Sequence, residues 1–197
     1  FPSTEVDIVA VKKGPASIES MYEEYLAIPE TAKEVLAAQE AGFDAAIVGC
    51  FGDPGLDGIR EITDMLVLGP ASASLTLAAT LGHRISILTV TDSIMGPLRR
   101  LVWEAGVLDK LASIRAINIS VIDLNKDHDG SLNRMIEAGK TAINEDGTEV
   151  IVLGCMSMGF LDVAEVMTKE LGIPVINPSK TGLKVAETLV ACTLAHS

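Results

Sequence analysis

The sequence predicts an α/β protein of two pseudo-symmetric lobes, each a mostly parallel sheet flanked by helices, with a cleft between them. Three observations predict this fold class. Apolar runs alternate with helical patterns, the order that builds a parallel sheet with helices on both faces. The runs are continuous, as in strands buried on both faces. Two of them, 44–50 and 149–155, both consist of an acidic residue, an apolar stretch, a glycine and a cysteine.

The elements of the first part follow from local composition. Residues 5–11 (E-V-D-I-V-A-V) are strand-like, and residues 28–41, rich in Ala, Glu and Lys, predict a helix. Residues 44–49 form the first continuous apolar strand, which ends before the breaker Asp53-Pro54-Gly55. The elements predicted next are a short helix over 56–64, a strand over 65–69 and an Ala/Ser/Leu-rich helix over 71–81.

The second part continues the alternation. Residues 83–91 (H-R-I-S-I-L-T-V-T) predict a strand. The other strands are predicted over 117–124, 149–154 and 174–177, and the helices over 93–104, 132–145, 160–171 and 181–194. In such a sheet, functional residues belong at the carboxyl ends of the strands, where Cys50 and Cys155 both lie.

The similarity of the two Gly-Cys runs extends further along the chain. After the first, a helix leads to V-L-G-P-A-S (67–72), and after the second, a helix leads to V-I-N-P-S-K (175–180). The cysteines and the prolines of these stretches repeat at nearly the same spacing. We therefore expect two duplicated lobes in one integrated unit: residues 1–80 with 178–197 form lobe one, and residues 81–177 form lobe two.

The composition excludes several classes of protein. The 197 residues are 48% hydrophobic and 21% charged, which suits a sizeable core. The net charge of −12 is opposite to that of a nucleic-acid binder. No apolar run approaches the ~20 residues of a membrane helix. Three cysteines without clustered spacing, and no visible secretory signal, favour a reducing, cytoplasmic location without a disulfide framework.

The two Gly-Cys sites, G-C-F-G-D-P-G (49–55) and G-C-M-S-M-G (154–159), are the candidate reactive sites. Each cysteine is expected to follow a strand and precede a helix, where unpaired N–H groups and the helix dipole lower a thiol pKa and can hold an enolate oxygen. Two thiols across one cleft can remove a proton from one face of a carbon and return it on the other. The alternative is a pair of buried apolar cysteines, the role expected for Cys192.

Other residue patterns carry less chemistry. Asp53 is expected to cap a helix. The three histidines share no motif, and no metal-ligand spacing, phosphate loop or nucleophile elbow is present, so no metal and no cofactor are expected. Thr89 and Thr91 end a strand on the side of the cysteines, where they either face the cleft, are solvated or act as caps.

Four motifs resemble the aspartate/glutamate racemase superfamily and, within it, the hydantoin racemase group, which includes allantoin racemases. The motifs are G-P-A-S-I-E (14–19), C-F-G-D-P-G-L-D (50–57), S-I-L-T (86–89) and V-L-G-C-M (152–156), and the resemblance covers nearly the whole chain. It implies that Cys50 and Cys155 are the paired acid and base. The substrate contacts that it implies are the backbone amides after each cysteine, a threonine and a pocket wall: Phe51, Gly52, Met156, Ser157, Thr89 and Ile18.

Some features depart from the family pattern. The family begins with a strand that ends in a P-N-T-like loop, and this chain starts after it, so lobe one is expected to lack that strand. Thr89-Val90 stands where two threonines are frequent, G-C-M-S-M where G-C-A-G-M is frequent, and Asn177 where an aspartate is frequent. These departures touch the pocket and leave the particular substrate open. The different residues after the two cysteines predict thiols of unequal pKa.

The resemblance implies a cofactor-independent racemase that inverts C5 of a 5-substituted hydantoin by a two-cysteine, two-base mechanism, with its active site in the cleft between the lobes. Allantoin, or an amino acid such as aspartate or glutamate, is the alternative substrate. A further alternative is a non-catalytic protein that binds a small molecule in the cleft. We expect a hydantoin-like small molecule as partner, no nucleic acid, no membrane, and a homo-oligomer.

Overall fold

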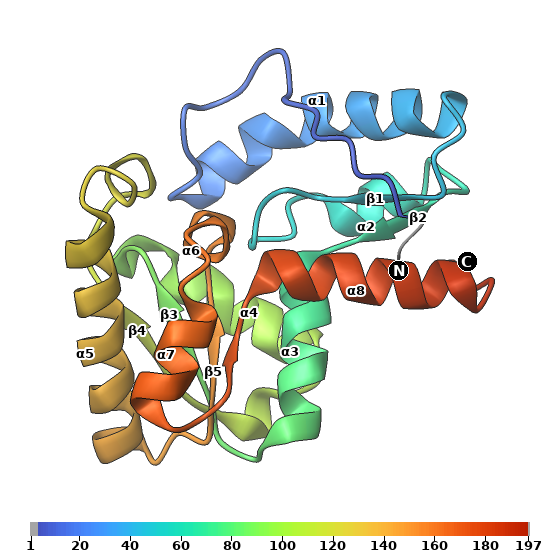
Figure 1. Cartoon of the computed structure of the whole chain (residues 1–197). Coiled ribbons are helices and arrows are strands. Elements are labelled where there is room, and N and C mark those ends of the chain that lie inside the picture. Colours follow the sequence, from blue (N-terminus) through green and yellow to red (C-terminus); the bar gives the residue numbers. More distant parts are fainter. Residues whose placement is uncertain (1–3, 197) are drawn as a thin grey trace.

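The computed structural model describes residues 4–196 and contains two parallel sheets (Figure 1). The small sheet pairs β1 (Ala45–Ile47) with β2 (Leu66–Leu68). The large sheet has the strand order β4-β3-β5-β6, and its pairs are all parallel. Its strands are β3 (Ile85–Thr89), β4 (Leu111–Ala116), β5 (Val150–Leu153) and β6 (Val175–Ile176). The predicted α/β class with parallel sheets is confirmed.

Helices connect and cover the strands. The α-helices are α1 (Met21–Glu40), α2 (Leu56–Arg60), α3 (Pro70–Leu81), α4 (Met95–Glu104), α5 (His128–Asp146), α6 (Met156–Phe160), α7 (Ala164–Leu171) and α8 (Pro178–Ala191). Helices α3 and α8 pack against each other; α8 also contacts both strands of the small sheet, and α3 contacts β5 of the large one. This pair therefore joins the two sheets (Figure 1).

The large sheet forms the main core. Every residue of β3 and β5 is buried, and Ile87, Val152 and Leu153 are completely so. In the small sheet β2 is buried, whereas β1 is half-buried along its length. Continuous apolar runs therefore correctly indicated strands covered on both faces, most clearly in the large sheet.

Two strand predictions are wrong. Residues 5–11 form no strand, and Val6, Ile8 and Val9 are exposed. Residues 117–124 do not form the edge strand either: β4 is the preceding segment 111–116, which pairs with β3, and Val121–Asp123 is a 3₁₀ turn. A strand exists only where a ladder partner exists, so pairing overrode the local pattern in both segments.

Helix α1 begins at Met21, well before the predicted residue 28, and continues through Pro29. Ser20 is its N-cap: the Glu23 N–H donates to Ser20 Oγ at 3.3 Å, and the Glu23 carboxylate accepts from Ser20 Oγ at 3.0 Å. This reciprocal capping starts the helix. The prediction from the Ala, Glu and Lys content of residues 28–41 missed the first two turns, which include Glu24.

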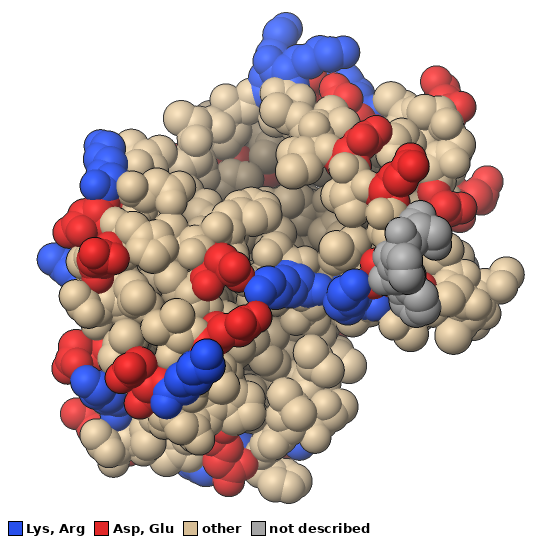
Figure 2. Space-filling view, viewed as in Figure 1, with Lys and Arg blue, Asp and Glu red and all other residues tan. Residues whose placement is uncertain are grey.

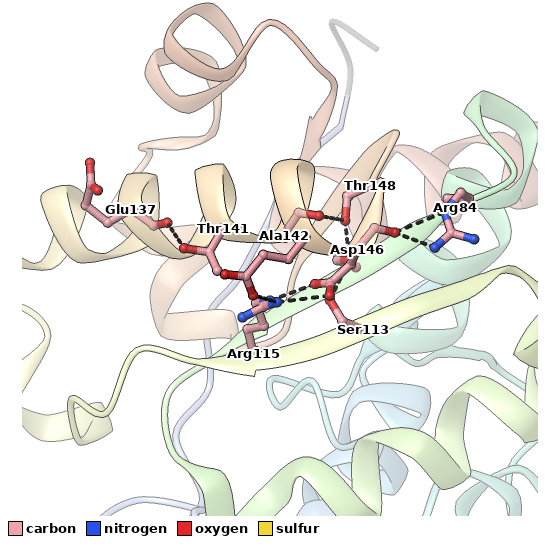
Figure 3. Close-up of polar contacts among 10 residues, drawn as sticks. Arg84, Ser113, Arg115, Glu137, Thr141, Ala142, Asp146 and Thr148 are labelled. Carbon is pink, nitrogen blue, oxygen red and sulfur yellow. Dashed lines mark hydrogen bonds and ion pairs between the residues drawn. The ribbon is translucent and has the colours of Figure 1, made fainter.

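A polar cluster binds the C-terminal end of α5 to the large sheet (Figure 3). The Arg115 guanidinium donates to Asp146 at 2.7 and 2.9 Å and holds the pKa of that carboxyl below its ordinary value. Arg84 donates to the Asp146 carbonyl oxygen, and the Thr148 hydroxyl donates to the Ala142 carbonyl oxygen at 2.9 Å. These charges are satisfied within the fold. Within residues 4–196, no helix has both the length and the apolar character needed to cross a bilayer.

Candidate active site

A cavity of about 140 Å³ lies where β1 and β5 end at the two Gly-Cys dipeptides. This is the volume of roughly five liquid water molecules, which suits a small ring. Figure 2 shows the surface hollowed below α1, with a rim that is mainly neither Lys, Arg, Asp nor Glu. Seven of the eight sequence-predicted site residues line the cavity: Ile18, Cys50, Phe51, Gly52, Cys155, Met156 and Ser157.

Cys155 is the N-cap residue of α6, as the sequence predicted for a cysteine between a strand and a helix. The N–H groups of Ser157 and Met158 and the Ser157 hydroxyl act on its thiol to lower the pKa. Gly154 allows this turn, because a Cβ there would lie 2.5 Å from the Ile87 side chain and 3.1 Å from the Leu88 carbonyl oxygen. The close approach of β5 to β3 therefore fixes the position of this cysteine.

Asn177 forms hydrogen bonds at the turn and helix that follow Cys155. Its Nδ2 donates to the Gly159 carbonyl oxygen at 2.8 Å, and its Oδ1 accepts from Ser179 N–H at 3.0 Å and from Lys180 N–H at 3.2 Å. An amide can donate and accept in this way, whereas a carboxylate could only accept. Asn177 thus fastens α6 to the start of α8.

Cys50 lies in a different environment. It follows β1 in a turn, and the next helix, α2, begins only at Leu56. The Gly52 N–H donates to Cys50 Sγ at 3.4 Å and lowers the thiol pKa. The carboxylates of Glu24 and Asp53 act in the opposite direction, as does the Cys155 thiol. Both cysteines line the same cavity.

Burial raises the pKa of both thiols, that of Cys50 to about 12, which corrects the lowered pKa predicted from the sequence. The prediction counted the N–H groups at the strand ends and left out desolvation. In a cavity between two apolar cores, loss of hydration disfavours the thiolate more than these N–H groups favour it. Both groups are thiols near neutral pH, and each thiolate is a strong base once formed.

The loop before α1 closes one side of the cavity. Ile18 lines it, and the neighbouring Glu19 bonds to two segments that follow β3 and β4. The Ser93 hydroxyl donates to the Glu19 carbonyl oxygen at 2.8 Å, and the Val121 N–H donates to Glu19 Oε1 at 2.8 Å. Because these bonds hold the loop against the large-sheet side, Ile18 is fixed over the cysteines.

Thr89 and Cys192 do not occupy their expected positions. Thr89 does not line the cavity; it is completely buried, close to where a Gly154 Cβ would lie. Its hydroxyl has no hydrogen-bond partner among the described residues. Cys192 is exposed at the end of α8 rather than in the core, since its helix turns that face to solvent.

Asp53 caps a helix as predicted, but the helix is α3 rather than the adjacent α2. The N–H groups of Ala71 and Ser72 each donate to its carboxylate at 2.9 Å. The N-cap residue of α3 is Gly69, where a Cβ would lie 2.1 Å from Asp53 Oδ2. Burial raises the pKa of Asp53 to about 6. Asp53 thus ties the Cys50 turn to α3.

Glu24 is the site residue that the sequence reading missed. It lines the cavity from α1, is only 6% exposed, and has a pKa raised by burial. Its neighbour Glu23 is a capping residue, and nothing in the local pattern separates the two. The signal is the helix start at Ser20, which places Glu24 one turn into α1 and toward the core.

No group of three or more metal-ligating side chains occurs in residues 4–196.

Comparison with known proteins agrees with this geometry. The family model described as Asp/Glu/Hydantoin racemase matches residues 1–186. The chain belongs to this family. It is therefore an isomerase of the racemase type, and the fold and position of the cavity are those that the sequence motifs implied.

Individual members of the family cover most of the chain. A hydantoin racemase from Pseudomonas sp. (strain NS671) is 41% identical over 187 residues, which make up 95% of this chain and 74% of that protein. A hydantoin racemase from Paenarthrobacter aurescens is 38% identical over 189 residues, 95% of this chain and 79% of that protein. The structure of allantoin racemase from Klebsiella pneumoniae matches with a TM-score of 0.95 at 34% identity, covering 100% of this chain and 80% of that one.

Proposed function

We propose that this racemase inverts C5 of a 5-substituted hydantoin without a cofactor, with Cys50 and Cys155 as the two bases. The observation that carries the proposal is that two thiols line one small cavity from the ends of strands in different sheets. A racemase of this kind needs a proton acceptor on one face of a carbon and a proton donor on the other. The cavity has room for a small molecule between the two turns, as such a transfer requires.

The proton moves in two steps. The Cys155 thiolate removes the C5 proton and becomes a thiol, and the electron pair left on C5 passes to the adjacent carbonyl as an enolate. The Cys50 thiol then gives its proton to the opposite face of C5 and becomes the thiolate. The other enantiomer reacts with the roles exchanged. Backbone N–H groups of the two turns stabilise the enolate oxygen. Proton exchange with solvent restores the starting form.

The surroundings of the thiols support Cys155 as the first base. Three hydrogen-bonding groups of Ser157 and Met158 favour its thiolate against one opposing carboxylate, Glu19. Cys50 has one such group, the Gly52 N–H, and two nearby carboxylates that oppose ionisation. Because burial raises both pKa values, each thiolate is a stronger base than that of an exposed cysteine. A hydantoin supplies the rest of the driving force, since its carbonyl and ring nitrogens acidify the C5 proton.

The lining of the cavity favours an uncharged ring as substrate. Its walls are mainly apolar and include Ile94, Leu98, Leu101 and Val121, and the lining residues include no Lys or Arg. A free aspartate or glutamate would bring carboxylates that need a cation when buried. Allantoin, itself a hydantoin with a ureido substituent, is the second candidate, supported by the close structural match to an allantoin racemase.

A racemisation screen tests the proposal. Optical rotation is followed at neutral pH for both enantiomers of a 5-alkyl hydantoin, allantoin, aspartate and glutamate. We expect both enantiomers of a hydantoin to reach zero rotation, and Cys50→Ser to abolish the change. Racemisation of aspartate or glutamate alone would overturn the substrate class, and full activity of Cys50→Ser would overturn the mechanism.

A further inference from the structure

Glu24 is a buried carboxylate that the proton transfers do not use. It extends from the second turn of α1 into the cavity, and 6% of the residue is exposed. Among the described residues, no N–H or O–H group donates to its side chain; its bond from the backbone N–H to the Ser20 carbonyl oxygen belongs to the helix start. The carboxylate therefore has open hydrogen-bonding capacity toward the cavity.

The position of Glu24 beside Cys50 is fixed by a glycine. A Cβ on Gly52 would lie 2.4 Å from Glu24 Oε1 and 3.6 Å from Cys50 Sγ. The carboxylate and the thiol therefore both lie close to the same backbone position. A ligand that places a carbon against Cys50 has its neighbouring ring atoms within reach of Glu24.

The charges around Glu24 do not neutralise it closely. Arg100 favours its ionised form and Asp53 opposes it. Arg100 is half-exposed and pairs with Glu104 at 3.3 Å, and Asp53 is occupied at the start of α3. The Glu24 oxygens are not among the fully buried side-chain atoms that lack a partner, so the carboxylate is accessible at the cavity wall, where a ligand can supply the donor.

We propose that the Glu24 carboxylate accepts a hydrogen bond from a ring N–H of the substrate and so selects cyclic amides over molecules without that donor. This inference rests on the proposed hydantoin substrate. A hydantoin ring carries two N–H groups and two carbonyl oxygens. The carbonyls can accept from the backbone N–H groups of the cysteine turns, whereas the N–H groups need an acceptor. Glu24 is the carboxylate among the residues that line the cavity.

Paired changes in the enzyme and the substrate test this contact. Initial racemisation rates are measured for wild type, Glu24→Leu and Glu24→Gln with a 5-alkyl hydantoin and with its N1-methyl and N3-methyl derivatives. Each rate is divided by the buffer-catalysed rate of the same compound. We expect Glu24→Leu to lower kcat/KM roughly 10- to 100-fold for the parent hydantoin, the range for a lost hydrogen bond to a charged group. Methylation of the nitrogen that donates to Glu24 removes this hydrogen bond already in wild type. For that derivative Glu24→Leu should therefore lower kcat/KM little further, and the derivative identifies the nitrogen. Glu24→Gln, which keeps an amide oxygen, should fall in between.

Two controls separate this role from a structural one. Glu40→Gln removes an exposed carboxylate from the same helix and should leave every rate unchanged. Glu24→Leu should not lower the melting temperature, because no described residue forms a hydrogen bond or close ion pair with the Glu24 side chain that would be lost. Equal losses for the parent and both methyl derivatives, or a melting temperature that falls with activity, would overturn the inference. The proposed function would then stand if wild type still racemises the parent hydantoin; no activity on any hydantoin would overturn both.

Discussion

The turn after β1 and the turn after β5 carry the same Gly-Cys dipeptide in different surroundings. Cys155 begins α6, after a strand that is buried throughout, with three hydrogen-bonding groups that favour its thiolate. Cys50 lies in a turn without an adjacent helix, after a half-buried strand, with one N–H donor and two carboxylates nearby. A repeated sequence thus places two thiols on one cavity, while the residues that follow give them different electrostatic surroundings.

Removal of one thiol at a time tests this comparison of the two turns with the largest expected effect. Cys50→Ser and Cys155→Ser should each lower kcat for racemisation on the order of 10²- to 10⁴-fold, the usual contribution of a positioned acid or base. Polarimetry measures the loss. Cys192→Ser is the matched control, because Cys192 is exposed at the far end of α8. If either Cys50→Ser or Cys155→Ser keeps full activity, the two cysteines do not act as a catalytic pair.

Crowding the first turn tests its geometry. Gly52→Ala would place a Cβ 2.4 Å from Glu24 Oε1 and 3.6 Å from Cys50 Sγ, so the carboxylate must shift. We expect kcat/KM to fall about 10²-fold, since a displacement of about 1 Å costs that much in a preorganised site. Gly58→Ala is the control, because nothing lies within 4 Å of its Cβ position. Similar activity of the two variants would contradict the tight packing around Cys50.

The difference in pKa between the thiols can be measured directly. Single-cysteine proteins, made from Cys50→Ser or Cys155→Ser in a Cys192→Ser background, are alkylated with iodoacetamide across pH. Alkylation follows the thiolate, so the rate at Cys50 should keep rising throughout the alkaline range, because its pKa is raised to about 12. Because three hydrogen-bonding groups favour its thiolate, Cys155 should reach half of its limiting rate at a lower pH than Cys50. A midpoint at lower pH for Cys50 than for Cys155 would reverse the assignment of the first base.

The smallest expected effect is on the stability of the turn after β1, which contains Cys50 and Asp53. Asp53→Asn should lower the free energy of unfolding by about 1–2 kcal/mol at pH 7.5, because Ala71 and Ser72 donate to different carboxylate oxygens and an amide replaces one of these acceptors with a donor. Urea unfolding measures this, with exposed Asp57→Asn as control. The folded pKa of about 6 lies above the ordinary 3.8, so the stabilising contribution of the Asp53 proton is lost as pH rises through about 6. The advantage of wild type should therefore be larger at pH 4.5; an advantage that grows with pH would contradict this.

Local pattern predicted much of the fold. The strands around residues 47, 87 and 152 were identifiable because a strand buried on both faces must be apolar at successive positions. The segment 5–11 has similar composition but no ladder partner in the structure, and β4 was missed because pairing with β3, rather than its own composition, makes it a strand. Strand pairing is a property of the whole fold that a short window does not contain.

The candidate site was predictable where motif and geometry coincide. Cys50, Cys155 and the residues after them line the cavity because each follows the carboxyl end of a parallel strand, and the ends of β1 and β5 meet there from two different sheets. Thr89 could not be placed, since its outward or inward direction depends on the packing against Gly154. Glu24 and the raised thiol pKa values were missed because burial arises from the approach of α1 and the two sheets, which are distant in sequence.

The central claim is that the two thiols act on opposite faces of one carbon. Exchange of the C5 proton in D₂O at neutral pH, followed by NMR for each hydantoin enantiomer separately, tests it most directly. Cys50→Ser should exchange only the enantiomer whose proton faces Cys155, and Cys155→Ser only the other enantiomer. Exchange of the same enantiomer by both variants, or of both enantiomers by either one, would contradict the two-base account.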